Sequence, residues 1–299
     1  MSEVYRAAAL GTRTRQFLFH YCRSVLSFRR FEPYDNFGIS HKPCCRSLPK
    51  ELFLGQLENR VAIVTGAATG LGRGIAMLYA QEGADVAVLD RNGPGSEMVA
   101  NEISKLGRRS IALEVDVGDE EAVIVAMSRA EKALGPPDIL VNNAGIITVA
   151  LMEGMETEIW DDMLRINLKS VFLCTRAVLP AMRAKGYGRI INISSQLAHK
   201  GGYGMTHYAA AKAGVIGLTK ALAHEVTAAN IAVNAICPGP LDTDMKLPPE
   251  WAANKQNDLL IGRQGRVEEI VPTALLLATE SAAFYVGTTF NPNGGDVLI

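Results

Sequence analysis

A glycine-rich segment at residues 65–72, TGAATGLG, constrains the fold of this chain more than any other feature. It lies between a short β-rich apolar run at 61–64 and a segment with helical periodicity at 71–82. A second strand signal at 85–89 completes a βαβ unit. Its glycines are Gly66, Gly70 and Gly72. Such glycines let the backbone turn tightly and approach a pyrophosphate at the helix N-terminus, although a tight turn without a ligand is the alternative explanation.

The same alternation of strand and helix signals continues to the end of the chain. Further strand-like runs lie at 110–115, 138–142, 188–194, 231–236 and 287–291, and helical stretches lie at 96–106, 119–134, 157–185, 207–229 and 267–279. The strands are continuous apolar runs, which is typical of a parallel sheet covered on both faces. We therefore predict one α/β domain over 57–299, a doubly wound Rossmann-type fold. Its seven-stranded parallel sheet is flanked by helices on both faces, with ligands at the carboxyl ends of the strands.

Composition excludes several classes of protein. The 299 residues carry a net charge of -1, which offers no overall field for nucleic acid. No apolar run approaches the roughly 18 residues of a membrane span. Five cysteines without C-x-x-C spacing favour a reducing compartment, and no acids or histidines have metal-ligand spacing. We expect a cytoplasmic protein that binds a small-molecule substrate, with no nucleic acid, membrane or metal.

The first 50 residues differ from the rest. They hold nine Lys or Arg against three acids, and eight of the 19 aromatic residues, without a lasting helix or strand period. We interpret residues 1–55 as a poorly ordered basic N-terminal extension. Because a segment rich in Arg and poor in acids is also typical of mitochondrial transit peptides, the mitochondrial matrix is the alternative location.

The end of the second predicted strand bears on cofactor choice. Asp90 lies 18 residues beyond Gly72, where a carboxylate can accept the adenosine ribose hydroxyls and repel a 2′-phosphate. NAD is therefore favoured over NADP. Arg91 is the complication, because a neighbouring guanidinium can bind that phosphate, and NADP remains an alternative.

A second chemical signal is Tyr208-Ala-Ala-Ala-Lys212, which opens a predicted helix. Its spacing places the phenol and the ammonium one turn apart on the same helix face. A phenol that works near neutral pH needs its pKa lowered by roughly three units, about 4 kcal/mol, and a nearby cation shifts it in that direction. Ser195 ends a strand 13 residues earlier, at the same edge of the sheet. His207 adjoins Tyr208, but adjacent helix positions point differently, so we expect a surface or interface histidine there.

These residues together resemble the compact, single-domain branch of the short-chain dehydrogenase/reductase family. The resemblance covers about 57–299 and rests on many motifs in order. They are the T-G-x-x-x-G-x-G segment, Asp116-Val117, Asn142-Asn-Ala-Gly145, Asn167, Ser195, Tyr208, Lys212, Pro238-Gly239 with Thr243, and Gly294-Gly295. The chain departs from the pattern at Asn293, where an Asp is frequent, and in its N-terminal extension.

The resemblance implies roles for individual residues. Tyr208 would be the general acid/base, and Lys212 would depress its pKa and bind the nicotinamide ribose. Ser195 would hold the substrate oxygen, and Asn167 would position a water in a proton relay behind Lys212. The residues expected to bind the cofactor are Gly66, Thr69, Gly70, Leu71, Gly72, Asp90, Arg91, Asp116, Val117, Asn143, Ala144, Gly145, Tyr208, Lys212, Pro238, Gly239 and Thr243.

Two enzymatic functions fit this resemblance. The preferred one is an oxidoreductase that transfers a hydride between NAD and a secondary alcohol or ketone. The alternative is an NADPH-dependent 3-oxoacyl-acyl-carrier-protein reductase, which the core also resembles. A non-catalytic dinucleotide-binding protein is a third, less favoured hypothesis. Substrate choice is expected to come from the loop 240–261, and the resemblance implies a homotetramer that packs its helices near 157–185 and 207–229.

Overall fold

The computed structural model describes residues 55–243 and 259–298. Leu57–Ile299 is one compact unit by its internal contacts. The predictions for the N-terminal extension, and those for the part of the substrate loop at 244–258, lie outside the described residues. Among the helices that the structure describes, none is long and apolar enough to cross a membrane.

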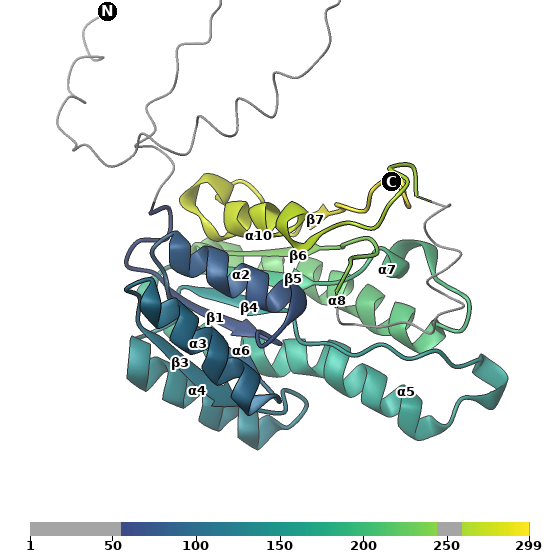
Figure 1. Ribbon diagram of the computed structural model, residues 1–299, viewed down its shortest axis with the longest axis horizontal. Coiled ribbons are helices and arrows are strands. Elements are labelled where there is room, and N and C mark those ends of the chain that lie inside the picture. Colours follow the sequence, from purple (N-terminus) through teal and green to yellow (C-terminus); the bar gives the residue numbers. More distant parts are fainter. Residues whose placement is uncertain (1–54, 244–258, 299) are drawn as a thin grey trace, which may run out of the picture. The chain divides into compact units, whose positions relative to one another are not determined.

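Seven parallel strands form one sheet in the order β3-β2-β1-β4-β5-β6-β7 (Figure 1). The strands are β1 (Val61–Thr65), β2 (Asp85–Asp90), β3 (Ser110–Glu114), β4 (Ile139–Asn142), β5 (Gly188–Ile193), β6 (Ile231–Ile236) and β7 (Thr289–Phe290). The order reverses between β1 and β4, so the carboxyl ends of these two strands border the crevice in which doubly wound sheets bind ligands. The predicted fold class is confirmed.

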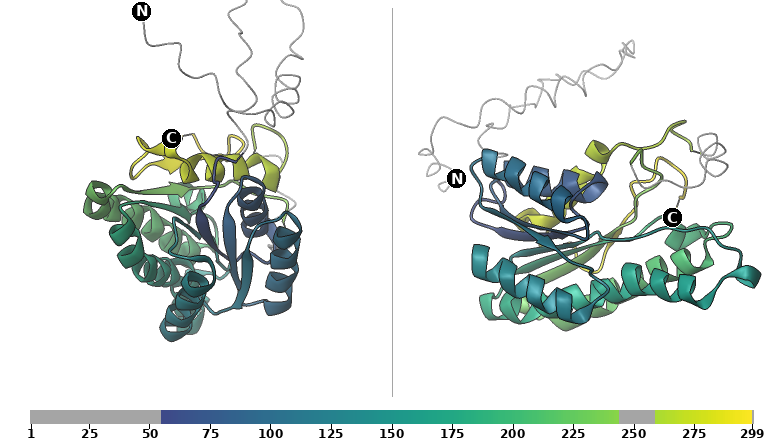
Figure 2. Two further views of the ribbon diagram at one scale, coloured as in Figure 1. Left: turned by 90° about the vertical axis from the view of Figure 1, so that its left-hand side faces the viewer. Right: turned by 60° about the horizontal axis from the view of Figure 1, so that its bottom comes forward.

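Helices cover both faces of the sheet, as the two views of Figure 2 show. One face packs against α2 (Gly70–Gln81), α3 (Gly93–Lys105) and α10 (Val271–Ala278), and the other against α4 (Glu120–Leu134), α6 (Ser170–Lys185) and α8 (Thr206–Val226). Successive residues of β1 alternate between the two apolar cores, with Ala62 and Val64 in one and Val61 and Ile63 in the other. This two-sided burial explains why the strands have no polar face.

Several element boundaries differ from those predicted. Helix α3 begins at Gly93 because the Asn92 side chain accepts a hydrogen bond from the Gly95 amide over 3.1 Å, an N-cap. The stretch 157–185 is not one regular helix. Between α5 (Thr157–Leu164) and α6 lies a π-helical segment, Arg165–Lys169. Strand β7 is only two residues long because Pro292, soon after it, has no amide to donate to a ladder.

A buried chain of polar side chains joins the sheet to the helices that carry the predicted site. Asn142 at the end of β4 donates to Asn192 of β5 over 2.8 Å and to Thr175 of α6 over 3.1 Å. Asn192 in turn donates to Thr219 of α8 over 2.9 Å. These bonds fix the position of α8 relative to β5, which ends two residues before Ser195.

Candidate active site

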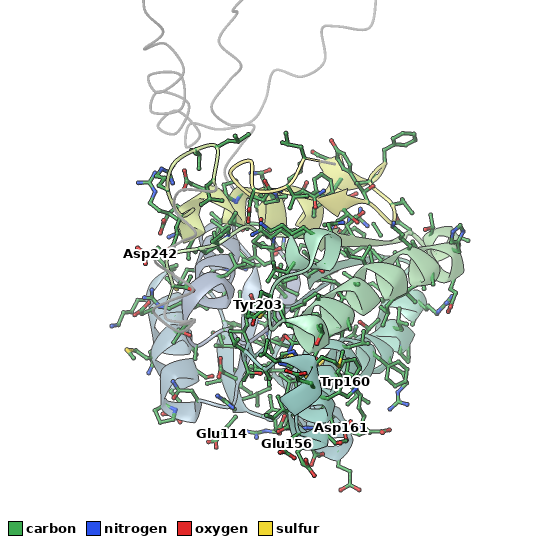
Figure 3. All side chains as sticks on the ribbon, turned by 90° about the vertical axis from the view of Figure 1, so that its right-hand side faces the viewer. Glu114, Glu156, Trp160, Asp161, Tyr203 and Asp242 are labelled. Atoms are coloured by element: carbon green, nitrogen blue, oxygen red, sulfur yellow. The ribbon has the colours of Figure 1, made fainter. Side chains whose placement is uncertain are left out.

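A cavity of about 820 Å³ opens at the carboxyl ends of the strands and gathers almost every predicted site residue. Of those residues only Gly72 does not line it. Figure 3 shows the face that carries Asp242, which borders the cavity, and Tyr203, which is 75% exposed. Residues from several connections between strands and helices thus meet at one site.

The glycine-rich turn is built as its sequence predicts. Gly66 and Gly70 have φ values of +63° and +54°, a region that favours glycine. A Cβ at Gly72 would lie 2.1 Å from the Gly66 carbonyl oxygen, so Gly72 serves the close packing inside the turn instead of lining the cavity. The Asn143 side chain donates to the carbonyl oxygens of Thr65 and Gly66 over 2.9 and 3.0 Å and holds the turn against the segment after β4.

The N-terminus of α2 fits a dinucleotide pyrophosphate. Its N-cap residue, Thr69, makes no side-chain capping bond, and the first turn contains no acidic residue. The first amides and the positive end of the helix dipole therefore have no anionic partner on the helix itself. Together with the positive-φ glycines and the size of the cavity, this arrangement fits a nicotinamide dinucleotide.

Asp90 and Arg91 both line the cavity beyond the turn. The Asp90 carboxylate accepts hydrogen bonds from the Ala68 amide over 3.1 Å and from the Asn92 amide over 2.9 Å, so its orientation is fixed. Arg91 makes no hydrogen bond or ion pair with any other described residue. The fixed Asp90 carboxylate and the Arg91 residue thus both border the cavity at the predicted ribose position.

Asp116 is engaged by a residue that sequence reasoning did not identify. Arg165 Nη1 lies 2.8 Å from one Asp116 carboxylate oxygen, and Arg165 Nε lies 3.0 Å from Asp162. Burial raises the pKa of Asp116, but the hydrogen bonds from Arg165 and from the Gly118 amide outweigh it and hold the pKa below its usual range. The π-helical segment therefore contacts the loop after β3 directly.

Ser195 and Tyr208 lie together at the inner part of the cavity. The Leu197 amide donates to the Ser195 hydroxyl over 3.2 Å, which orients that side chain. Burial raises the pKa of Tyr208 to about 12, although a hydrogen bond with Ser195 lowers it. The Lys212 ammonium lies 5.7 Å from the centre of the Tyr208 ring. In the protein alone, burial thus outweighs the depression of the Tyr208 pKa that was expected from Lys212.

Lys212 and Asn167 are both buried beside these residues. Lys212 is 4% exposed and donates to the Ile193 carbonyl oxygen over 2.9 Å, and burial lowers its pKa to about 8. The Asn167 amide nitrogen donates to Ile146 O over 3.0 Å and to Met163 O over 3.1 Å, while its carbonyl oxygen is buried without a hydrogen-bond partner among the described residues. A Cβ at Gly145 would lie 2.7 Å from that oxygen and 3.5 Å from Lys212 Nζ. The space at Gly145 therefore lies beside the Asn167 carbonyl oxygen and the Lys212 ammonium, both of which can make further hydrogen bonds to a bound polar group.

The expectation for His207 was wrong. The side chain is completely buried, not at the surface, and one ring nitrogen lies 2.9 Å from the Thr148 hydroxyl. The first turn of α8 buries both His207 and Tyr208 because the segment after β4 covers it. Cys174 and Cys237 are buried and free, in agreement with a packing role.

Sequence reasoning missed several other residues of the cavity wall. They include Ile146, Ile147, Asp162, Arg165, Leu197 and Gln264. Ile146 and Ile147 follow the Asn-Ala-Gly motif directly, a position that could have identified them. Gln196 also lines the cavity, and its side chain donates to Asp296, which pairs with Lys200. Within the described residues, no group of three or more His, Cys, Asp or Glu side chains could hold a metal ion.

Comparison with known proteins agrees with this geometry. Residues 60–251 match the family model of the short chain dehydrogenases. The chain belongs to this family. It is 39% identical over 241 residues to a 3-oxoacyl-acyl-carrier-protein reductase of Pseudomonas aeruginosa, covering 80% of this chain and 98% of the relative. It is also 40% identical over 243 residues to an acetoacetyl-CoA reductase of Rhizobium meliloti, covering 79% and 98%.

Solved structures of the same family share the fold. A putative short-chain alcohol dehydrogenase from Sinorhizobium meliloti superposes with a TM-score of 0.78 at 36% identity, covering 81% of this chain and 98% of that one. A short-chain type dehydrogenase/reductase from Mycobacterium marinum gives 0.79 at 33% identity, covering 83% and 99%. This short-chain dehydrogenase is accordingly an NAD(P)-dependent oxidoreductase that acts on hydroxyl or keto groups.

Proposed function

We propose that the protein transfers a hydride between NAD and a secondary alcohol or ketone, with Tyr208 as general acid/base. The observation that carries this proposal is the convergence of Tyr208, Ser195 and Lys212 in one cavity. A nicotinamide cofactor bound there would supply or accept the hydride. The protein itself then has to hold the substrate oxygen and move one proton.

Each residue has a role that its environment supports. Ser195 holds the substrate oxygen where negative charge develops, since its hydroxyl is oriented by the Leu197 amide. Tyr208 gives its proton to that oxygen during reduction and accepts it during oxidation, and its raised pKa keeps it protonated before reduction. Lys212 binds the ribose of the cofactor, and Asn167 positions a water beside it. The unpartnered Asn167 oxygen supports this last assignment.

The fixed Asp90 carboxylate supports NAD as the preferred cofactor. Both of its oxygens are oriented by backbone amides, so the carboxylate cannot turn away from a ribose 2′-phosphate. Arg91 supports the alternative, an NADPH-dependent 3-oxoacyl-acyl-carrier-protein reductase, because its guanidinium lines the same cavity. The names of the relatives from Pseudomonas and Rhizobium favour an acyl thioester among ketone substrates.

The test is a matched assay with the purified protein. Reduction of an acetoacetyl thioester is measured with NADH and with NADPH, and oxidation of a panel of secondary alcohols is measured with NAD. We expect turnover preferring NADH, lost in Tyr208→Phe by about 10²- to 10⁴-fold without loss of NADH binding. Tyr203→Phe, at an exposed tyrosine, is the control. Turnover that survives in Tyr208→Phe contradicts the mechanism, and a preference for NADPH contradicts the cofactor assignment.

We further propose a homotetramer that packs α5, α6 and α8 against symmetry mates. Phe172 of α6 supports it, since this aromatic ring is half exposed with Arg176 stacked over it at 4.8 Å. Light scattering on the purified protein measures the mass of the assembly.

The cytoplasm remains the proposed location, with the mitochondrial matrix as the alternative, and fractionation of cells distinguishes the two.

A further inference from the structure

We infer that His207 is a positioning residue that fixes the substrate-side wall of the cavity, at 146–149, against the helix that carries Tyr208. This inference rests on the proposed function, since it assigns His207 to the binding of the proposed substrate. The segment begins directly after Gly145, so its position decides where a substrate carbonyl sits beneath Tyr208 and Ser195.

The evidence begins with one contact between distant parts of the chain. His207 Nε2 lies 2.9 Å from Thr148 Oγ1, and the two residues are 59 positions apart. His207 is completely buried at the start of α8, directly before Tyr208. The His207 ring therefore connects the rigid helix α8 to Thr148, in the middle of the wall.

Among the described residues, hydrogen bonds attach the wall and the residue after it, Ala150, at three points, of which the His207 contact is the central one. Before it, Ile146 O accepts the Asn167 amide over 3.0 Å. After it, the Ala150 amide donates to Gly204 O over 3.0 Å. Gly204 lies so close to the wall that a Cβ there would be 2.8 Å from a Val149 methyl. Ile146, at the first attachment, and Ile147, between the first two, both line the cavity.

Within the described residues, the His207 ring has one side-chain hydrogen-bond partner, Thr148. Its other nitrogen, Nδ1, is buried without a hydrogen bond to any described residue. Burial lowers the pKa of His207, so the ring is neutral and engages Thr148 as a neutral donor or acceptor. If the Thr148 hydroxyl is removed, the buried ring loses the polar partner that the structure shows for it, and an unsatisfied buried polar atom favours displacement of the wall.

The position of the wall predicts which kinetic constant changes. Ile146 and Ile147 line the cavity and pack against the apolar cluster that contains Tyr208, whereas the glycine turn and Asp90 are held by separate bonds to Asn143 and to backbone amides. Release of the wall should therefore weaken substrate binding without changing cofactor affinity. Replacement of a histidine that only stabilised the fold would not weaken substrate binding selectively over cofactor binding.

The experiment compares Thr148→Val and His207→Phe, which remove the hydrogen bond from either side, with Thr148→Ser, which keeps the hydroxyl. Thr206→Ala, at the exposed neighbouring position of α8, is the matched control. We expect the first two variants to raise the KM of the ketone substrate about tenfold, the cost of one part-buried hydrogen bond. Their kcat and NADH Kd should stay near the parent values, and Thr148→Ser should restore the parent KM. The double variant should be no worse than either single variant.

Hydrogen exchange provides a readout that needs no turnover. The Ala150 amide, bonded to Gly204 O, should exchange faster in Thr148→Val and His207→Phe but not in Thr206→Ala. Unchanged exchange of folded variants overturns the inference, as does an unchanged substrate KM or an equal loss of NADH affinity. If the parent protein turns over no ketone or alcohol, the proposed function fails, and the exchange result still decides whether His207 holds the wall.

Discussion

Lys212 donates a hydrogen bond from its ammonium to the Ile193 carbonyl oxygen over 2.9 Å. The neighbouring Ser194 hydroxyl donates to the Lys212 carbonyl oxygen over 2.7 Å, so the end of β5 and the first turns of α8 are joined in both directions. The ammonium is thus buried against a neutral carbonyl. Within the described residues it has no carboxylate within ion-pair distance. Such a cation is costly to bury, and the lowered pKa of Lys212 expresses that cost.

This burial predicts that Lys212 makes the stability of the cofactor-free protein depend on pH. The pKa is about 8 in the folded protein against 10.5 in the unfolded chain, so between these values the unfolded state binds more protons. The folded state therefore gains stability as the pH rises through this window. From pH 8 to 10 the gain is about 2 kcal/mol. Urea unfolding of the parent and of Lys212→Met, measured at pH 7, 8, 9 and 10, isolates the contribution of Lys212 to this pH dependence.

Lys212→Met should be the more stable of the two proteins at pH 7, and the difference should shrink toward pH 10. The window ends at pH 10 because the pKa of Tyr208, raised to about 12 by burial, acts in the opposite direction above that value. A difference that does not vary with pH would mean that the Lys212 pKa is not lowered by burial.

Asp90 is predicted to discriminate between the two cofactors. Its carboxylate is held by the Ala68 and Asn92 amides and cannot move away from a 2′-phosphate. Asp90→Ser should weaken NADH binding about tenfold, through loss of a charged acceptor, and should strengthen NADPH binding. Fluorescence titration with each cofactor measures both constants. Glu114→Gln, at the neighbouring strand end in register with Asp90, is the control.

A second comparison concerns a glycine whose position has no room for a side chain, Gly72, and one whose position has room, Gly217. In Gly72→Ala the new methyl group would lie 2.1 Å from the Gly66 carbonyl oxygen, so the turn must open. We expect a loss of about 1–3 kcal/mol in stability, with NADH affinity reduced as well. At Gly217, inside α8, no atom of the described residues outside its own stretch of helix lies within 4 Å of the place that a Cβ would occupy. Gly217→Ala should therefore stabilise the helix by about 1 kcal/mol. Urea unfolding and NADH titration of both variants test the contrast.

The parts of this structure that sequence reasoning predicts are those governed by local rules. The apolar run at 61–64 followed by glycines is a strand and a turn because burial on both faces and positive φ values demand those residue types. The i, i+4 spacing of Tyr208 and Lys212 places both on the inner side of α8. Because parallel strands end at one edge, residues at the strand ends were also expected to meet there.

Features that depend on tertiary contacts could not be predicted from the sequence. Nothing in the periodicity of 157–185 marks the π-helical segment that turns Asn167 inward, since the extra residue per turn is compensated by contacts with other elements. His207 was expected outside because adjacent helix positions diverge, yet a loop from elsewhere in the chain covers the side that it faces. The role of Arg165 depends on Asp116, 49 positions away.

The last prediction concerns the buried polar chain that supports α8. Thr219 accepts the Asn192 amide over 2.9 Å and donates its own proton to the Val215 carbonyl oxygen over 2.8 Å. Thr219→Val has almost the same shape but leaves the Asn192 amide without that acceptor, at a cost of about 1–3 kcal/mol. Thr219→Ser keeps the acceptor and should recover most of the loss. Thermal unfolding of the three proteins, with Thr227→Val at an exposed threonine as the control, measures the difference. Equal stability of the Val and Ser variants would show that the bond between Asn192 and Thr219 does not hold α8 to the sheet.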